Sequence, residues 1–361
     1  MGAAASCNGE TAATAAAPRL GFGEVAANDV ESAVRIRSTG CPPRCVVVLD
    51  NKAHKDPEEC PRLAVVEGDG VATPVTGGTA SVVRANDLES ISLVDAETGT
   101  YAAVESQCRV HVFTLSKSDG AFVADQVATG ALPVPDGEDT DNWKDPHPAN
   151  VEAARVFRDA RGDLACLWGA RGGFNYAGSN APSDEVWLRY APFDVRRGTA
   201  DARSVVSATL KNLGASGSWR ALTCLDVDAS GRIYFAACYD GEEDGHPLHK
   251  ADRDHFKNRR AFRSLVASVS TPATVDAKTG DARILGRFSG IKIEALWRDE
   301  NGRFTLVTDD EDLGSLIATV DLDENGVFPR EVDFFDIAAA ARGGVAARHW
   351  GCSGVAPLAC A

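Results

Sequence analysis

An internal repeat constrains the fold of this chain more than any other feature of its sequence. Five segments share one design: a short apolar strand with a charged residue near its start, a turn, a second apolar strand ending in polar residues, and a third strand after a loop. The charged marker residue recurs at positions 31, 89, 152, 220 and 294. Each unit is therefore roughly 60 to 75 residues long, and self-similarity at such a period indicates a repeat architecture.

The strands of each unit can be placed from their apolar runs and from the turns between them. Gly99, Gly162, Gly231 and Gly302 follow four of the first strands, and glycine supplies the positive φ that hairpin turns require. The first strands open at 29–32, 87–90, 150–153, 218–221 and 292–295; the second strands cover 46–50, 101–105, 164–168, 233–237 and 304–308; the third strands cover 62–66, 110–114, 186–190, 264–268 and 315–319.

Units of this length without helical periodicity suit a propeller blade of four antiparallel strands with one long loop. The sequence therefore predicts an all-β fold, a five-bladed β-propeller, over residues 21–335. A sixth degenerate blade in 120–150 or 325–361, and an unrelated β-sandwich, are the alternatives. We expect a strand at 21–26 to join the last blade and close the ring, which removes exposed sheet edges. A short helix and a tail are expected at 336–361.

The marker position carries four carboxylates and one guanidinium. In a propeller the first strand of each blade lines the central channel, so Glu31, Glu89, Glu152, Arg220 and Glu294 are expected to point to one axis. Crowded carboxylates repel one another, and burial raises their pKa values. A hard cation such as Ca²⁺ would relieve this repulsion, as would the arginine. Alternatively, the glutamates cap the channel by accepting hydrogen bonds from backbone N–H groups and water.

The ends of the second strands supply another set of polar residues. If these side chains face the channel, a substrate would dock at the mouth of the channel that they line. The three aspartates that follow the last two of these second strands would then position a water molecule. The set consists of Asp50, Glu105, Arg171, Asp240, and Asp309 with Asp310.

The repeated opening, x-hydrophobic-Glu-small-hydrophobic, resembles the EG repeats of an uncharacterised bacterial propeller family, of esterase-like phytases and of calcium-activated nucleotidases (apyrases). The resemblance covers roughly residues 29–322. It implies that Glu31, Glu89, Glu152 and Glu294 ligate an axial Ca²⁺, as glutamates from successive blades do in the nucleotidases. The chain departs from the pattern at Arg220, and by having Ser or Ala where those families have Gly. Gluconolactonase-like propellers are similar too.

One basic cluster, at 253–263, could bind an anionic group. Arg259 and Arg260, together with Arg220, are the candidate anion-binding residues. The alternative is a solvated loop that pairs with the acidic stretch at 240–245.

Two functions from different classes remain open on these residues. The first is a calcium-binding propeller that hydrolyses a small anionic ester or phosphoester at the channel mouth. The second is a non-enzymatic module that binds a protein partner, because a fold alone does not imply catalysis and no sharp catalytic motif is present. The formal charge of −15 makes nucleic acid an unfavourable partner. We expect a monomer.

The first twenty residues are expected to form a flexible leader. Gly2 and Ser6 match the myristoylation pattern, and Cys7 beside them could be palmitoylated. Two acyl chains anchor a protein stably, so this reading predicts attachment at the cytoplasmic face of a membrane. An unmodified cytoplasmic leader and a plastid transit segment are the alternatives.

Overall fold

The computed structural model describes part of the chain, and all structural statements below concern that part. The described residues are 35–37, 45–49, 61–67, 72–75, 77–133, 151–170, 186–210, 221–239, 263–269, 283–289, 291–308, 316–322, 331–333, 335–336 and 352–357.

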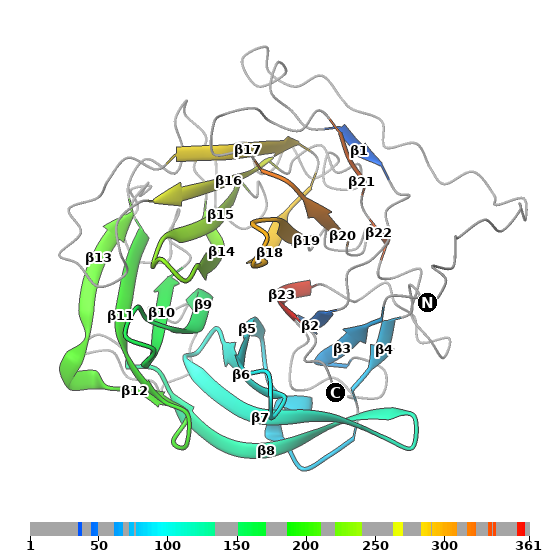
Figure 1. Cartoon of the computed structure of the whole chain (residues 1–361), viewed down its shortest axis with the longest axis vertical. Coiled ribbons are helices and arrows are strands. Elements are labelled where there is room, and N and C mark those ends of the chain that lie inside the picture. Colours follow the sequence, from blue (N-terminus) through cyan, green and yellow to red (C-terminus); the bar gives the residue numbers. More distant parts are fainter. Residues whose placement is uncertain are drawn as a thin grey trace, which may run out of the picture.

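The sheets are arranged around a common centre as the blades of a β-propeller are (Figure 1). Four sheets are formed by strands that follow one another along the chain: β5 (Leu88–Asp95), β6 (Thr100–Glu105), β7 (Arg109–Ser118) and β8 (Ala121–Ala131); β9 (Val151–Arg158), β10 (Leu164–Ala170), β11 (Val186–Asp194), β12 (Thr199–Ala200) and β13 (Val206–Leu210); β14 (Ala221–Val227), β15 (Ile233–Tyr239), β16 (Arg263–Val269) and β17 (Arg283–Ser289); and β18 (Ile293–Arg298), β19 (Phe304–Thr308), β20 (Leu316–Val320) and β22 (Phe335–Asp336).

A further four-stranded sheet joins distant parts of the chain. It consists of β23 (Cys352–Pro357), β2 (Cys45–Leu49), β3 (Leu63–Val66) and β4 (Ala72–Pro74), in that order. Outside the larger sheets, β1 (Arg35–Arg37) pairs in parallel with β21 (Glu331–Asp333), and two short 3₁₀ helices, η2 (Ser81–Arg84) and η3 (Ala202–Ser204), lie in connections. The described residues contain no helix with the length and apolar character needed to span a membrane.

The predicted second and third strands are confirmed in all five repeats. The second strands are β2, β6, β10, β15 and β19, and the third strands are β3, β7, β11, β16 and β20. The expected turns are also present, because Gly99, Gly162, Gly231 and Gly302 all have positive φ. Runs of buried apolar residues and turn glycines are local signals, and they placed these elements to within a few residues.

The closure of the ring differs from the sequence-based expectation. The strand next to β2 is β23, near the C-terminus, rather than a strand at 29–32 or 21–26, and those two segments lie outside the described residues. Residues 352–357, which the sequence analysis assigned to a C-terminal tail, form this inner strand; the rest of 337–361, with the expected short helix, lies outside the described residues. The sheet of β2 thus takes its inner strand from a segment about 300 residues further along the chain.

The inner strands β5, β9, β14, β18 and β23 each pack against the next and form a closed ring around the axis (Figure 1). The approach of β23 to β5 is close, since a Cβ at Gly354 would lie 2.9 Å from the Cα of Ser90. Five buried clusters fill the spaces between neighbouring sheets, and each cluster draws apolar side chains from two sheets. The core is thus distributed between the sheets, which leaves the loops free to carry polar groups.

Candidate functional site

Each inner strand has a β-bulge, and in three of the five strands the bulge coincides with the marker position. The ladder register skips Glu89 in β5, Glu152 in β9 and Glu294 in β18, so the sequence pattern located equivalent residues in these strands. In β14 the skipped residue is Thr223 rather than Arg220, and in β23 it is Ser353 rather than Glu31. The described ring therefore holds three glutamates and two hydroxyl residues; Arg220 and Glu31 lie outside the described residues.

The described ring does not have the geometry of a calcium site. Glu89, Glu152 and Glu294 are buried, and the Lys292 ammonium lies 2.8 Å from a carboxylate oxygen of Glu294. The Thr223 hydroxyl donates to the carbonyl oxygen of Ile293 at 2.6 Å. Within the described ranges, no three side chains of histidine, cysteine, aspartate or glutamate are grouped to hold a metal ion. We therefore assign no step to Ca²⁺, and a calcium site that includes Glu31 stays a prediction.

A small hollow lies on the axis between the inner strands. Its lining includes Ile91, Ala154, Leu225, Leu296 and Val355, one residue from each of the five inner strands. Its cavity volume is about 10 Å³, roughly the space that one water molecule needs. The lining also includes the charged residues Glu89 and Arg155. Within the part of the chain that the structure describes, this hollow is too small to hold an ester substrate.

Most of the other predicted site residues cannot be placed. Asp240, Asp309, Asp310, Arg259, Arg260, Gly2 and Cys7 lie outside the described residues. Glu105 is the described member of the set at the second-strand ends, and it belongs to a polar network that the sequence did not reveal.

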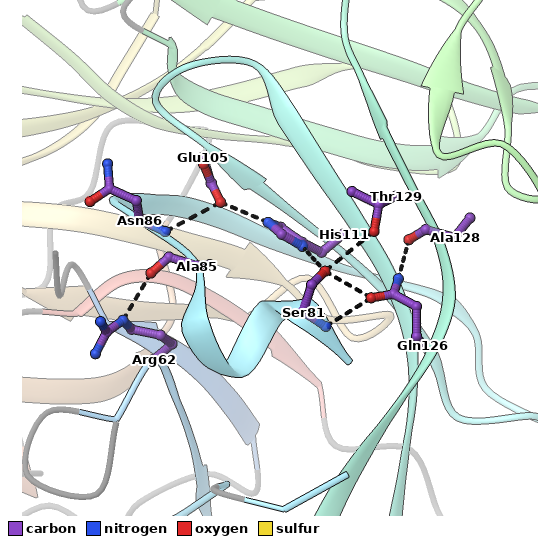
Figure 2. A network of polar contacts seen from close by, with 9 residues as sticks. All are labelled: Arg62, Ser81, Ala85, Asn86, Glu105, His111, Gln126, Ala128 and Thr129. Carbon is purple, nitrogen blue, oxygen red and sulfur yellow. Dashed lines mark hydrogen bonds and ion pairs between the residues drawn. The ribbon is translucent and has the colours of Figure 1, made fainter. Parts of the chain in front are cut away.

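A serine, a histidine and a glutamate form a continuous path in this network (Figure 2). Ser81 is the first residue of η2, between β4 and β5, whereas Glu105 ends β6 and His111 lies on β7. The Ser81 hydroxyl oxygen lies 2.8 Å from His111 Nδ1, and His111 Nε2 lies 2.8 Å from Glu105 Oε1. A nucleophile next to a base that a third group orients is the arrangement used in nucleophilic catalysis.

Burial differs sharply along this path. His111 is 1% exposed and Glu105 is 2% exposed, while Ser81 lies on the surface. The backbone N–H of Asn86 also donates to Glu105 Oε1, at 3.2 Å. The buried carboxylate can stabilise a positive charge on the imidazole, because Coulomb interactions are stronger away from water. Ser81, the residue that would attack a substrate, is exposed.

Gln126 on β8 holds Ser81 from the other side. Its Nε2 donates to the carbonyl oxygens of Val112, at 3.0 Å, and Ala128. This fixes its Oε1 toward Ser81, where it accepts the Ser81 backbone N–H at 2.8 Å and lies 2.8 Å from the hydroxyl oxygen. The exposed Thr129 hydroxyl is 3.3 Å from the same hydroxyl oxygen.

The segment that carries Ser81 is pinned to β8. Ala80 N–H donates to the Ala124 carbonyl at 3.0 Å, and Ala124 N–H donates to the Gly77 carbonyl at 3.1 Å. Gly78 has a φ of +105°, and a Cβ there would overlap the Ala124 carbonyl oxygen. Only glycine fits such a close approach with positive φ. The backbone at 77–80 thus sets where the Ser81 hydroxyl lies.

Sequence reasoning missed this site because its members belong to three different elements and no short motif joins Ser81 to His111. One signal was present. His111 occupies an inward-facing position of β7, two residues before the buried Phe113, and a histidine on an apolar face needs a polar partner.

Comparisons with known proteins give distant structural likenesses and no family. No family model matches the chain, and no curated protein matches it. A periplasmic gluconolactonase from Pseudomonas aeruginosa is 10% identical, with 81% of each chain covered and a TM-score of 0.38. The β-propeller domain of Cps50 (Swd1) from Myceliophteria thermophila is 13% identical, covering 79% of this chain and 84% of its own, with a TM-score of 0.32. A thermostable family-43 glycoside hydrolase is 13% identical, covering 70% and 72%, with a TM-score of 0.37.

The resemblance to the EG-repeat families stays a prediction, since no family match supports it. Structural likeness at these identities and TM-scores carries no inference about substrate or reaction, so the functional argument below depends on the site.

Proposed function

We propose that this chain is a β-propeller hydrolase of ester bonds with Ser81 as its nucleophile. The observation that carries the proposal is the path from the hydroxyl of an exposed serine through a buried imidazole to a buried carboxylate, with both contacts at 2.8 Å. We also infer that the sheet β23-β2-β3-β4 is a fifth blade, because its inner strand completes the closed ring of inner strands.

Each step of the reaction moves one proton to or from His111 Nδ1. Ser81 Oγ attacks the ester carbonyl carbon while its proton moves to His111 Nδ1, and Glu105 stabilises the imidazolium. Collapse of the tetrahedral intermediate breaks the bond to the alcohol oxygen, which takes the proton from His111 Nδ1. A water molecule then attacks the acyl-Ser81, gives a proton to the same nitrogen, and releases the acid as Ser81 Oγ takes that proton back. The Thr129 hydroxyl, 3.3 Å from Ser81 Oγ, is a candidate donor for the oxyanion.

Small acyl esters are the expected substrates, because Ser81 and Thr129 lie on the surface. The chain's charge of −15 does not favour a strongly anionic substrate unless a local basic group receives it. The basic cluster around Arg259 and Arg260 stays a candidate for that role, which phosphoester and carboxylate-bearing esters would test.

The test combines turnover with covalent labelling. Wild type should hydrolyse p-nitrophenyl acetate or butyrate, and a fluorophosphonate should label Ser81, as peptide mass spectrometry would locate. Ser81→Ala should lose both the turnover and the label, and His111→Gln should lower both by at least about 100-fold, as loss of a general base typically does. Ser116→Ala, at an exposed serine of β7 away from the network, is the matched control. Labelling that is absent, or equal in Ser81→Ala, would rule out the nucleophile.

The second candidate is a non-enzymatic interaction module, and the Gln126 contact favours it. The Gln126 carbonyl competes with His111 for the Ser81 proton, so the network could serve only to hold residues 77–87 on the sheet β5–β8. In that case Ser81→Ala would lower the unfolding free energy by about 1 kcal/mol, the net value of one hydrogen bond, with no turnover in either protein. Membrane tethering through Gly2 and Cys7 would accompany either function and stays a proposal.

A further inference from the structure

We propose that Gln126 is a positioning residue that favours the protonated state of His111 and so sets the pH below which Ser81 has no base. The inference rests on the proposed function and describes its regulation. It is carried by the presence of two acceptors for one hydroxyl proton, both 2.8 Å from the same oxygen.

A count of protons gives two states of the network. When His111 is neutral, its Nε2–H donates to Glu105 and its Nδ1 lone pair accepts the Ser81 hydroxyl proton, which is the arrangement ready for attack. When His111 is protonated, Nδ1–H donates to Ser81 Oγ, and the hydroxyl proton must turn to another acceptor. Gln126 Oε1 is placed to receive it. In this second state Ser81 has no base.

The orientation of the Gln126 amide is fixed by its other contacts. Nε2 faces the carbonyl oxygens of Val112 and Ala128, which accept hydrogen bonds and cannot donate them. Oε1 faces the Ser81 backbone N–H, which can only donate. A flipped amide would lose all three hydrogen bonds. The carbonyl therefore always faces the hydroxyl, stabilising the protonated state and opposing the neutral one.

Among the polar groups around His111, the Ser81 hydroxyl is the one that reorients when His111 gains a proton. Glu105 on β6 contacts Nε2, and Ser81 on η2 contacts Nδ1. From β8, Gln126 and Thr129 reach Ser81, and neither side chain is charged. The other charged groups of this region have their own partners: Asp87 accepts from Ser106, Asp125 accepts from Thr79, and the Arg62 Nε–H donates to the Ala85 carbonyl.

The experiment follows the His111 ring directly, so its readout does not require activity. Ring nitrogen shifts of the full-length protein are measured by NMR against pH, with His111→Gln used to assign the signal. Gln126→Met keeps the size of the side chain and removes the carbonyl. The titration midpoint of His111 should move to lower pH by about 0.5 to 1 unit, the equivalent of one net hydrogen bond. Gln126→Glu, a stronger acceptor, should move it to higher pH.

Val127→Ala is the matched control, because the neighbouring Val127 side chain is 46% exposed and outside the network. The acid limb of fluorophosphonate labelling at Ser81 should shift together with the His111 midpoint. An unchanged midpoint in both Gln126 variants would overturn the inference, whatever the labelling shows. A shifted midpoint without any labelling of Ser81 would instead reject the proposed hydrolase while retaining the coupling between Gln126 and His111.

Discussion

Replacement of Glu105 by leucine should destabilise the protein strongly, because it separates a buried pair. Two donors depend on the Glu105 carboxylate: His111 Nε2 at 2.8 Å and the Asn86 backbone N–H at 3.2 Å. Each buried donor left without an acceptor costs about 1–3 kcal/mol. With two such donors, we expect Glu105→Leu to lower the unfolding free energy by about 2–6 kcal/mol.

The pair can be tested by a double-mutant cycle in urea, with unfolding followed by tryptophan fluorescence. Glu105→Gln keeps an oxygen acceptor at the same position and should cost less than the leucine variant. Glu105→Leu combined with His111→Leu removes both polar groups, and should cost less than the sum of the single changes by about 1–3 kcal/mol, the coupling usual for contacting groups. Additive effects, or a cost for Glu105→Leu below about 1 kcal/mol, would refute the buried contact.

Three further predictions test other parts of the structure. Gly78→Ala should lower the unfolding free energy in urea and weaken Ser81 labelling, because the added Cβ would overlap the Ala124 carbonyl. Gly120 also has positive φ, but a Cβ there meets no atom within 4 Å, so Gly120→Ala should lower the unfolding free energy less. Equal losses in the two variants would contradict the close contact at Gly78. Desolvation acts to raise the pKa values of Asp159, Asp228 and Asp299, but hydrogen bonds outweigh it and hold all three below the ordinary value. Their contribution to stability is present above the unfolded pKa of about 4 and is lost as pH falls through the lower folded pKa values. The unfolding free energy measured in urea should therefore decrease from pH 5 to pH 3. An unfolding free energy that does not change over this range would contradict the hydrogen bonds to these three aspartates. In metal-free Glu31→Gln protein, which keeps the three described glutamates, calcium should give no rise in melting temperature; a stabilisation approaching 2.7 kcal/mol at about 100 times Kd would show that the ring binds the ion without Glu31.

The amino-acid sequence determined the elements whose signals are local. Apolar runs and glycine-containing turns located the second and third strands of every repeat, and the marker residue located the bulges at Glu89, Glu152 and Glu294. These features depend on neighbouring residues, because strand propensity, alternation and positive φ act within a few positions. The propeller class followed from their repetition.

In one repeat the hydrogen-bond register places the bulge at a residue other than the marker. Arg220 matches the marker by its charge and spacing, yet the bulge in β14 is at Thr223. A residue type can suggest a register. The register itself depends on which backbone groups of the neighbouring strand are paired, and a single strand's sequence does not contain that information.

Contacts between distant residues were decided by the tertiary structure alone. β23 pairs with β2 although about 300 residues separate them, and this pairing completes the ring of inner strands. Ser81, Glu105 and His111 likewise meet because the connection 77–87 is held against the sheet of β6, β7 and β8. The sequence contains each of these residues, but their chemistry arises from a proximity that only the folded backbone creates.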